Sequence, residues 1–165
     1  MMKKVIVIGC SGSGKSVFSR SFAQKTGLPL YHLDNIWWRA DGTTVERDEF
    51  DRALGEILAR DEWILDGNFD RTMERRMQAC DTVIFFDIPT EQCLEGIKAR
   101  KGKERPDMPW KNAPEDQDPE FVKFIRDFDH NRRPHIIELL KKYGDKNIVI
   151  FNSREEADAF IENIE

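Results

Sequence analysis

Three glycines and a lysine stand between two hydrophobic segments near the N-terminus, in the stretch GCSGSGKS at residues 9–16. The spacing Gly9-x-x-x-x-Gly14-Lys15-Ser16 fits the phosphate-binding pattern G-x-x-x-x-G-K-[ST]. A loop that curls around a phosphate needs glycine because a Cβ would obstruct its inward-facing amides. The pattern therefore predicts a phosphate site, and the alternative is a flexible glycine-serine loop.

We call residues 9–16 the phosphate loop. Lys15 is expected to reach the terminal phosphates of a nucleotide, and the Ser16 hydroxyl to bind Mg²⁺. The helix after the loop would add free N–H groups and the positive end of its dipole. Cys10 lies beside Lys15, which should lower the pKa of its thiol and make it reactive. The candidate nucleotide-binding residues are Gly9, Cys10, Ser11, Gly12, Ser13, Gly14, Lys15 and Ser16.

Hydrophobic runs on either side of the loop predict a strand before it and a helix after it. Residues 5–8 are β-branched, as in a strand buried on both faces. The helix should stop at Gly27, because Pro29 follows. Further strands are predicted at residues 28–34, 63–67, 82–87 and 147–151.

Helical patterns separate these strands. Thr43-x-x-Glu46 and Ser153-x-x-Glu156 resemble capping boxes, and helices are expected over 90–101 and from Pro119 onward. Pro134 should break the latter helix into two pieces. The alternation predicts one α/β domain over residues 1–165, a three-layer fold around a five-stranded parallel sheet.

Such a fold fits a small kinase or a GTPase-like switch. No N-K-x-D stretch is present to recognise guanine, and a polar, proline-rich insert at about 102–119 resembles a lid. Phosphoryl transfer needs positive charge and exclusion of water, which a cationic lid supplies. Arg100 and Arg105 are the candidate lid residues, and the alternative is a solvated charged loop. Basic residues near the insert are Lys98, Arg100, Lys101, Lys103 and Arg105.

Composition describes a globular chain with a modest acidic excess. Its 165 residues are 39% hydrophobic and 35% charged, with a net charge of −5. That charge makes DNA an unexpected partner, and no apolar stretch has membrane-spanning length. The three cysteines lack metal-ligand spacing, which suggests reduced thiols in the cytoplasm. We expect a monomer or weak dimer with a small-molecule substrate.

Several stretches resemble the small P-loop kinases of the adenylate-kinase and shikimate-kinase group, and most closely the bacterial DNA topology modulation proteins. The matching stretches are GCSGSGKS, LPLYHLDNIWW, WILDGNFDRT, CDTVIFFDIP and NRRP. The resemblance implies strand order 2-3-1-4-5, ATP over the phosphate loop, and an acceptor cleft beside strands two and three. Adenylate kinases carry D-G-F-P-R after the third strand. Here Arg71 comes one residue later and no proline is present.

Two acids lie at the ends of the predicted strands beside which the resemblance places the acceptor cleft. Asp66 occupies the position that holds Mg²⁺ through water, and its alternative role is a turn cap. Asp34 could orient a hydroxyl acceptor and take its proton, as the acid at the matching position of shikimate-type kinases implies. Its alternative is to cap the following turn.

Other candidates carry weaker signals. Arg132 falls on the stripe of Phe128 and could face phosphate, or it could pair with a carboxylate such as Asp129 or Glu138. Trp37 and Trp38 could stack on an acceptor or pack in the core. The histidines His32, His130 and His135 show no triad or metal spacing, which indicates structural roles.

Together these features predict an ATP- and Mg²⁺-dependent kinase that phosphorylates a hydroxyl of a small molecule. The alternatives are a nucleoside monophosphate kinase and an ATP-dependent DNA topology regulator.

Overall fold

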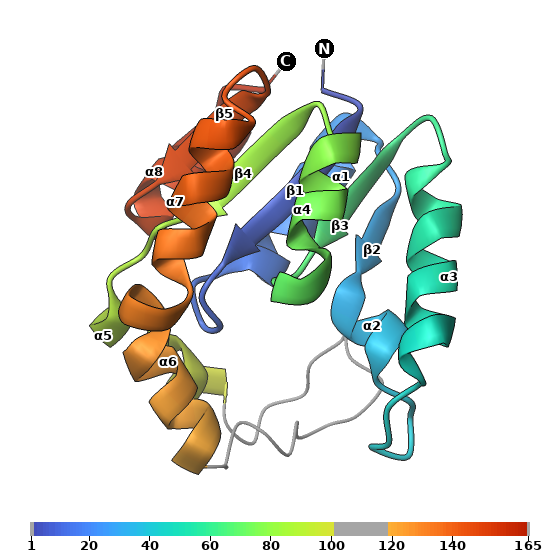
Figure 1. The fold of residues 1–165 in the computed structure, drawn as a ribbon. Helices are drawn as coiled ribbons and strands as arrows, with labels where there is room; N and C mark the ends of the chain where they lie inside the picture. The colour runs from blue at the N-terminus through green and yellow to red at the C-terminus, as the bar shows by residue number, and fades with distance from the viewer. Residues whose placement is uncertain (1, 101–118, 165) are drawn as a thin grey trace.

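The computed structural model describes residues 2–100 and 119–164 (Figure 1). The strands are β1 (Lys4–Gly9), β2 (Leu30–His32), β3 (Trp63–Asp66), β4 (Thr82–Phe86) and β5 (Asn147–Phe151). The helices are α1 (Lys15–Thr26), α2 (Leu33–Trp37), α3 (Arg47–Leu58), α4 (Asp70–Ala79), α5 (Thr90–Arg100), α6 (Pro119–Asn131), α7 (Arg133–Lys142) and α8 (Arg154–Glu162).

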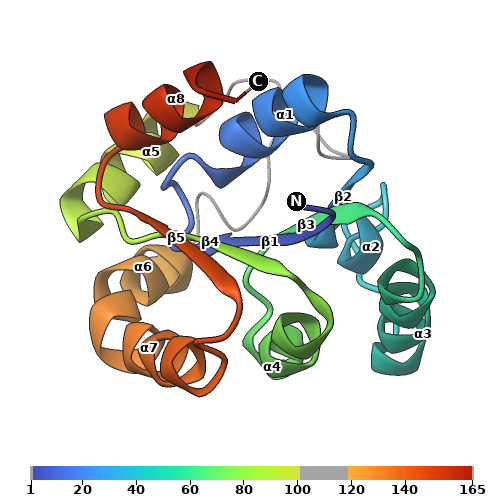
Figure 2. The same cartoon turned by 90° about the horizontal axis from the view of Figure 1, so that it is seen from above.

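The five strands form one parallel sheet in the order β2-β3-β1-β4-β5, which confirms the predicted fold and strand order. The sheet has helices on both faces: α1, α5 and α8 cover one, and α4, α6 and α7 cover the other (Figure 2). Residues 5–8 of the central strand are wholly buried, as their β-branched composition predicts.

Aromatic rings fill the layer beneath α1 and α8. Phe18 of α1 lies 5.2 Å, between ring centroids, from Phe86 of β4 and 5.4 Å from Phe151 of β5. Phe160 of α8 packs 5.5 Å from Phe151. Since α1 begins within the phosphate loop, this packing fixes the direction in which the helix N-terminus points.

Several helix boundaries follow the sequence signals. The Gly27 N–H donates to the Ala23 carbonyl at 2.8 Å in a left-handed cap that ends α1. Helix α6 stops at Asn131, and α7 begins at Arg133 with Pro134 in its first turn, so the predicted break is confirmed. Ser153 caps α8 by accepting the Glu156 N–H at 3.2 Å.

Other local predictions are wrong. The second strand ends at His32, and the chain turns at once into α2, so Asp34 lies in a first helical turn rather than at a strand end. The Thr43 hydroxyl donates to Asp41 at 2.6 Å and does not cap α3, which begins after Glu46. A local side-chain bond here competes with the capping box.

Helix α4 was not identified by the sequence patterns. It buries Thr72, Met73, Arg76 and Met77, so a polar and a charged residue share its buried face with two methionines. A buried arginine conceals the hydrophobic period on which helix prediction depends.

The predicted lid at 102–119 lies outside the described residues, except for Pro119, which begins α6. Within residues 2–100 and 119–164, we find no helix that is both long and apolar enough to cross a membrane.

Candidate active site

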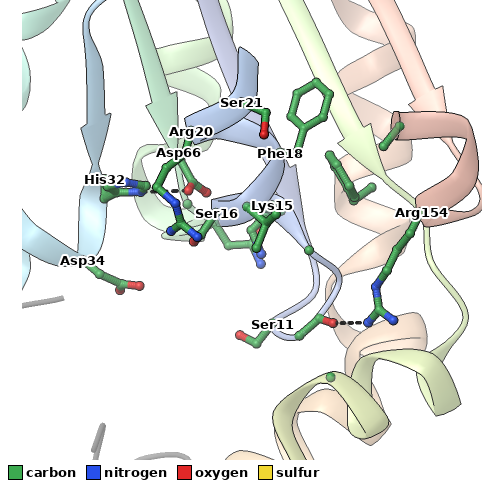
Figure 3. Close-up of a pocket in the computed structure, with 18 of the residues that line it drawn as sticks. Ser11, Lys15, Ser16, Phe18, Arg20, Ser21, His32, Asp34, Asp66 and Arg154 are labelled. Atoms are coloured by element: carbon green, nitrogen blue, oxygen red, sulfur yellow. Dashed lines mark hydrogen bonds and ion pairs between the residues drawn. The ribbon is translucent and has the colours of Figure 1, made fainter. Parts of the chain in front are cut away.

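A cleft of about 1180 Å³ opens where the parallel strands end, the usual ligand position in such sheets. One part is lined by the phosphate loop and α1, and another by residues after β2 and β3 (Figure 3). Residues of α5, α6 and α8 also line the cleft. Those used below are Lys15, Ser16, His32, Asp34, Asp66 and Arg154.

The phosphate loop has its shape because of its glycines. Gly12 and Gly14 have φ values of 82° and 104°, in the left-handed region that side chains rarely adopt. A Cβ on Gly12 would lie 2.1 Å from the carbonyl oxygen of Cys93 in α5, and one on Gly9 2.6 Å from that of Phe86. Both backbone strain and close packing therefore require glycine.

The ammonium group of Lys15 points back at the backbone of the phosphate loop. Lys15 Nζ donates to the Cys10 carbonyl oxygen at 3.0 Å, which holds the ammonium group against the loop. Ser16 follows in the first turn of α1 and also lines the cleft. The phosphate role of Lys15 and the Mg²⁺ role of Ser16 stay predictions.

Arg154 connects three elements around the loop. Its Nη2 donates to the carbonyl oxygens of Gly12, at 2.8 Å, and of Gln92, at 3.0 Å (Figure 3 shows the first). The first residue of α8 thus braces the phosphate loop against α5. Sequence reasoning missed Arg154 because its partners are distant backbone atoms.

The prediction of a reactive Cys10 is wrong. The residue is only 4% exposed, and its hydrogen bond with Cys93 and its burial raise the pKa of its thiol. Lys15 acts in the predicted direction, but its effect is smaller. The hydrogen bond with Cys93 and burial together outweigh the effect of the nearby positive charge on the pKa of Cys10.

Asp66 is hydrogen-bonded to His32, a residue for which the sequence indicated only a structural role. Its Oδ2 accepts a hydrogen bond from His32 Nδ1 at 2.9 Å, and both residues line the cleft. The register of β2 and β3 places them directly opposite each other. Asp66 also lies opposite Val7, two residues before the phosphate loop begins.

Ser16 and Asp66 provide oxygen donors on the same cleft, as the predicted Mg²⁺ site requires. Mg²⁺ usually binds one or two protein carboxylates together with substrate phosphates and water. Ser16 and Asp66 therefore fit Mg²⁺ bound together with a nucleotide. The described residues contain no cluster of three or more His, Cys, Asp or Glu side chains suited to a metal.

The loop after β3 is held by side-chain hydrogen bonds. The amide of Asn68 accepts the Gly9 N–H at 2.9 Å and donates to the Gly9 carbonyl, which ties this loop to the phosphate loop. Arg76, wholly buried in α4, donates to the carbonyls of Gly67 at 3.0 Å, Phe69 at 3.2 Å and Asn68. The L-D-G-N stretch marks the loop in the sequence, but no sequence signal indicated the buried arginine.

Asp34 reaches the cleft from the first turn of α2 (Figure 3). In the figure its carboxylate is directed toward the space in front of the phosphate loop. Because β2 ends at His32, earlier than predicted, Asp34 belongs to α2 rather than to a strand. Its side chain nevertheless lines the cleft.

The arginines considered for phosphate binding are held by carboxylates. Arg132 donates to Asp70 at 2.9 Å and Arg71 to Asp51 at 2.8 Å. The Arg132 partner is thus a carboxylate, though neither of the two proposed from the sequence. Neither arginine lines the cleft among the described residues, so a phosphate role for Arg132 would require this ion pair to break.

The other candidates divide between the core and the undescribed part of the chain. Trp37 packs against Phe50 at 5.8 Å between ring centroids, which supports the core alternative. Arg100 ends α5, but its side chain lies outside the described residues, as does all of Arg105. Their roles stay predictions.

The fold is similar to that of solved kinase structures. Shikimate kinase from Acinetobacter baumannii, in complex with shikimate, superposes with a TM-score of 0.65 at 20% identity, covering 99% of this chain and 91% of that one. Shikimate kinase from Bacteroides thetaiotaomicron gives 0.62 at 20% identity, covering 98% and 96%. A gluconokinase from Sinorhizobium meliloti 1021 gives 0.60 at 15% identity, covering 97% and 87%.

Sequence comparison gives a weaker match. The chain is 27% identical over 81 residues to an adenylate kinase of Thermotoga neapolitana, a match that spans 49% of this chain and only 36% of that protein. No family model matches the chain. These findings support the resemblance to the P-loop kinase group, and none supports the DNA topology modulation family.

Proposed function

We propose that this chain is an ATP-dependent kinase that phosphorylates a hydroxyl group of a small molecule. The observation that carries the proposal is the joining, in one cleft, of a phosphate loop with the Asp34 carboxylate. The phosphate loop suits a nucleoside triphosphate, and the Asp34 carboxylate suits an acceptor that must lose a proton.

In the proposed reaction, the acceptor oxygen attacks the γ-phosphorus of ATP while the bond to the bridging oxygen of ADP breaks. Lys15 and the amides of the phosphate loop offset the negative charge on the phosphates. Asp34 orients the attacking hydroxyl and takes its proton, which later passes to solvent. Mg²⁺, held by Ser16 and through water by Asp66, would supply further charge neutralisation.

A nucleoside monophosphate kinase is the main alternative, and the adenylate kinase match favours it. Its acceptor is an anion and would need free cations near Asp34. In this structure Arg71 and Arg132 pair with Asp51 and Asp70 and do not line the cleft, whereas Arg20 of α1 does. A carboxylate at the cleft would also repel a phosphate, so we favour the hydroxyl acceptor.

The test begins with the wild-type protein and a non-hydrolysable ATP analogue. Nucleosides, nucleoside monophosphates, sugars and vitamins are screened for an increase in melting temperature, and each hit is assayed for ADP release with ATP. We expect the best acceptor to be a hydroxyl compound. A nucleoside monophosphate as best acceptor would overturn the assignment.

The residue-level test is Asp34→Asn. It should retain ATP affinity and reduce phosphoryl transfer by roughly 100-fold or more, the usual contribution of a lost acid–base group. Asp158→Asn is the matched control, because Asp158 is an acid of α8 that lines the same cleft. Asp158→Asn should transfer the phosphoryl group at nearly the wild-type rate. A near-wild-type rate in Asp34→Asn as well would contradict the proposed mechanism.

A further inference from the structure

The pair formed by His32 and Asp66 lies between the two parts of the cleft. We infer that His32 is a positioning residue, which fixes the Asp66 carboxylate in the orientation that Mg²⁺-ATP binding requires. The inference rests on the proposed function, because it takes the metal role of Asp66 from there.

The sheet register brings these residues together. Parallel pairing sets Leu30 opposite Ile64 and therefore His32 opposite Asp66, at the last position of both strands. Their side chains are 10% and 4% exposed, so little space remains for alternative rotamers. The 2.9 Å bond is thus a consequence of the sheet itself rather than of a loop.

The chemistry of the bond assigns its direction. An ionised carboxylate only accepts hydrogen bonds, so the proton lies on His32 Nδ1. A carboxylate otherwise rotates easily about its last side-chain bond, whose torsion is broad. Because Oδ2 is held by the imidazole, the orientation of Oδ1 is fixed with it. Outer partners of this kind orient metal-binding groups in many proteins.

If the bond between His32 and Asp66 served only to stabilise the fold, it would have no reason to lie beside the space for a ligand. Here His32 and Asp66 both line the cleft, together with Ser16 at the start of α1. Figure 3 shows the pair on the side of the phosphate loop that faces Asp34. The bond therefore lies where a change of carboxylate orientation would be felt by the nucleotide-bound cation.

Three substitutions at His32 separate positioning from packing. His32→Leu fills the buried position with a branched apolar side chain and removes the donor. His32→Asn carries its amide nitrogen on Cγ, as Nδ1 is in histidine, and so preserves the bond to Asp66. His32→Gln keeps a donor but displaces it by one bond.

The readout is the Mg²⁺ concentration that gives half of the metal-dependent increase in affinity for a fluorescent ATP analogue. Wild type and His32→Asn should agree within about threefold, and His32→Leu should require roughly 10-fold more Mg²⁺, the lower end of measured outer-partner effects. His32→Gln should fall between them. Affinity for the analogue without Mg²⁺ should stay within about twofold of wild type, because the phosphate loop is unchanged. Mn²⁺ binding followed by electron paramagnetic resonance should give the same order.

Equal Mg²⁺ dependence in wild type and His32→Leu would overturn the inference, as would an equal defect in His32→Asn and His32→Leu at matching melting temperatures. If His32→Leu does not fold, His32→Gln decides: a wild-type Mg²⁺ dependence there also overturns it. Asp66→Asn shows whether Asp66 itself acts on the metal, and a neutral result would overturn the inference at its base. ADP release by the wild-type protein tests the kinase proposal separately, so the two can fail independently.

Discussion

Two loops leave the same edge of the sheet and line the same cleft, yet they are held in different ways. The phosphate loop after β1 depends on glycine conformations and on its own backbone, as in the 3.2 Å bond from the Ser13 N–H to the Cys10 carbonyl. The loop after β3 depends on the side chains of Asn68 and Arg76. The shape of the first loop is therefore set largely by its own glycines, with Asn68 and Arg154 bracing it from outside, whereas the second loop depends on side-chain hydrogen bonds throughout.

This difference implies different weaknesses. In the phosphate loop, added volume at Gly9 or Gly12 should do most harm, because a Cβ there would collide with a backbone carbonyl. In the loop after β3, removal of a hydrogen-bond donor should do most harm, because partly buried carbonyls would lose their partner. Substitutions in each loop can separate these two modes.

The largest effect is expected from Gly12→Ala. Its Cβ would meet the backbone of α5 at 2.1 Å, and its φ of 82° already disfavours alanine. Overpacking and left-handed strain together should lower the free energy of unfolding by about 2–5 kcal/mol. Denaturant titration measures the loss. Gly42→Ala is the control, since Gly42 has a similar φ of 87° but nothing within 4 Å of the added Cβ.

Equal losses in the free energy of unfolding for Gly12→Ala and Gly42→Ala would show that close packing of the phosphate loop on α5 contributes nothing to the effect at Gly12. Nucleotide binding should also be weakened in Gly12→Ala and retained in Gly42→Ala.

Lys15→Ala should act on function rather than on folding. Loss of a charge-assisted contact of about 1.5–3 kcal/mol corresponds to ATP binding weakened on the order of 100-fold. Calorimetry with Mg²⁺-ATP measures this, and Lys25→Ala in the last turn of the same helix is the control. Tight Mg²⁺-ATP binding by Lys15→Ala would contradict the phosphate-loop assignment.

Arg76→Met tests the second loop. Three carbonyls would lose a donor, although removal of a buried charge offsets part of the cost, because burial lowers the pKa of Arg76 to about 10. We expect a net loss of roughly 2 kcal/mol in the free energy of unfolding. Arg75→Met is the control on the exposed side of α4 and should leave the unfolding midpoint nearly unchanged. The same midpoint in both variants would refute a bracing role for Arg76.

The smallest effect concerns Cys10 in the otherwise ligand-accessible phosphate loop. Its raised pKa keeps the thiol protonated at neutral pH, and the reactive thiolate would form only as the pH rises well above the ordinary cysteine range. We expect alkylation at least about tenfold slower than that of free cysteine, with or without ATP. Mass spectrometry at pH 7 and pH 9 measures the rate. Rapid modification at pH 7 that ATP suppresses would restore the original prediction of a reactive thiol.

Local sequence patterns were sufficient for the α/β class with its five parallel strands and for the phosphate loop. The strands, the glycine spacing, the end of α1 at Gly27 and the break before Pro134 all depend on residues adjacent in the chain. Such signals are visible without knowledge of distant partners. The strand order, in contrast, was implied by the family resemblance, and the structure confirms it.

The partners of the charged residues were decided by tertiary structure alone. Sequence placed Asp66 near the phosphate loop, but only the β2–β3 register sets His32 beside it. Arg132 meets Asp70 of a helix that no pattern had revealed, and Arg76 is buried against three carbonyls. Each partnership depends on strand register, helix rotation and burial, which bring together residues separated in the chain, so the spacing of residue types could not predict it.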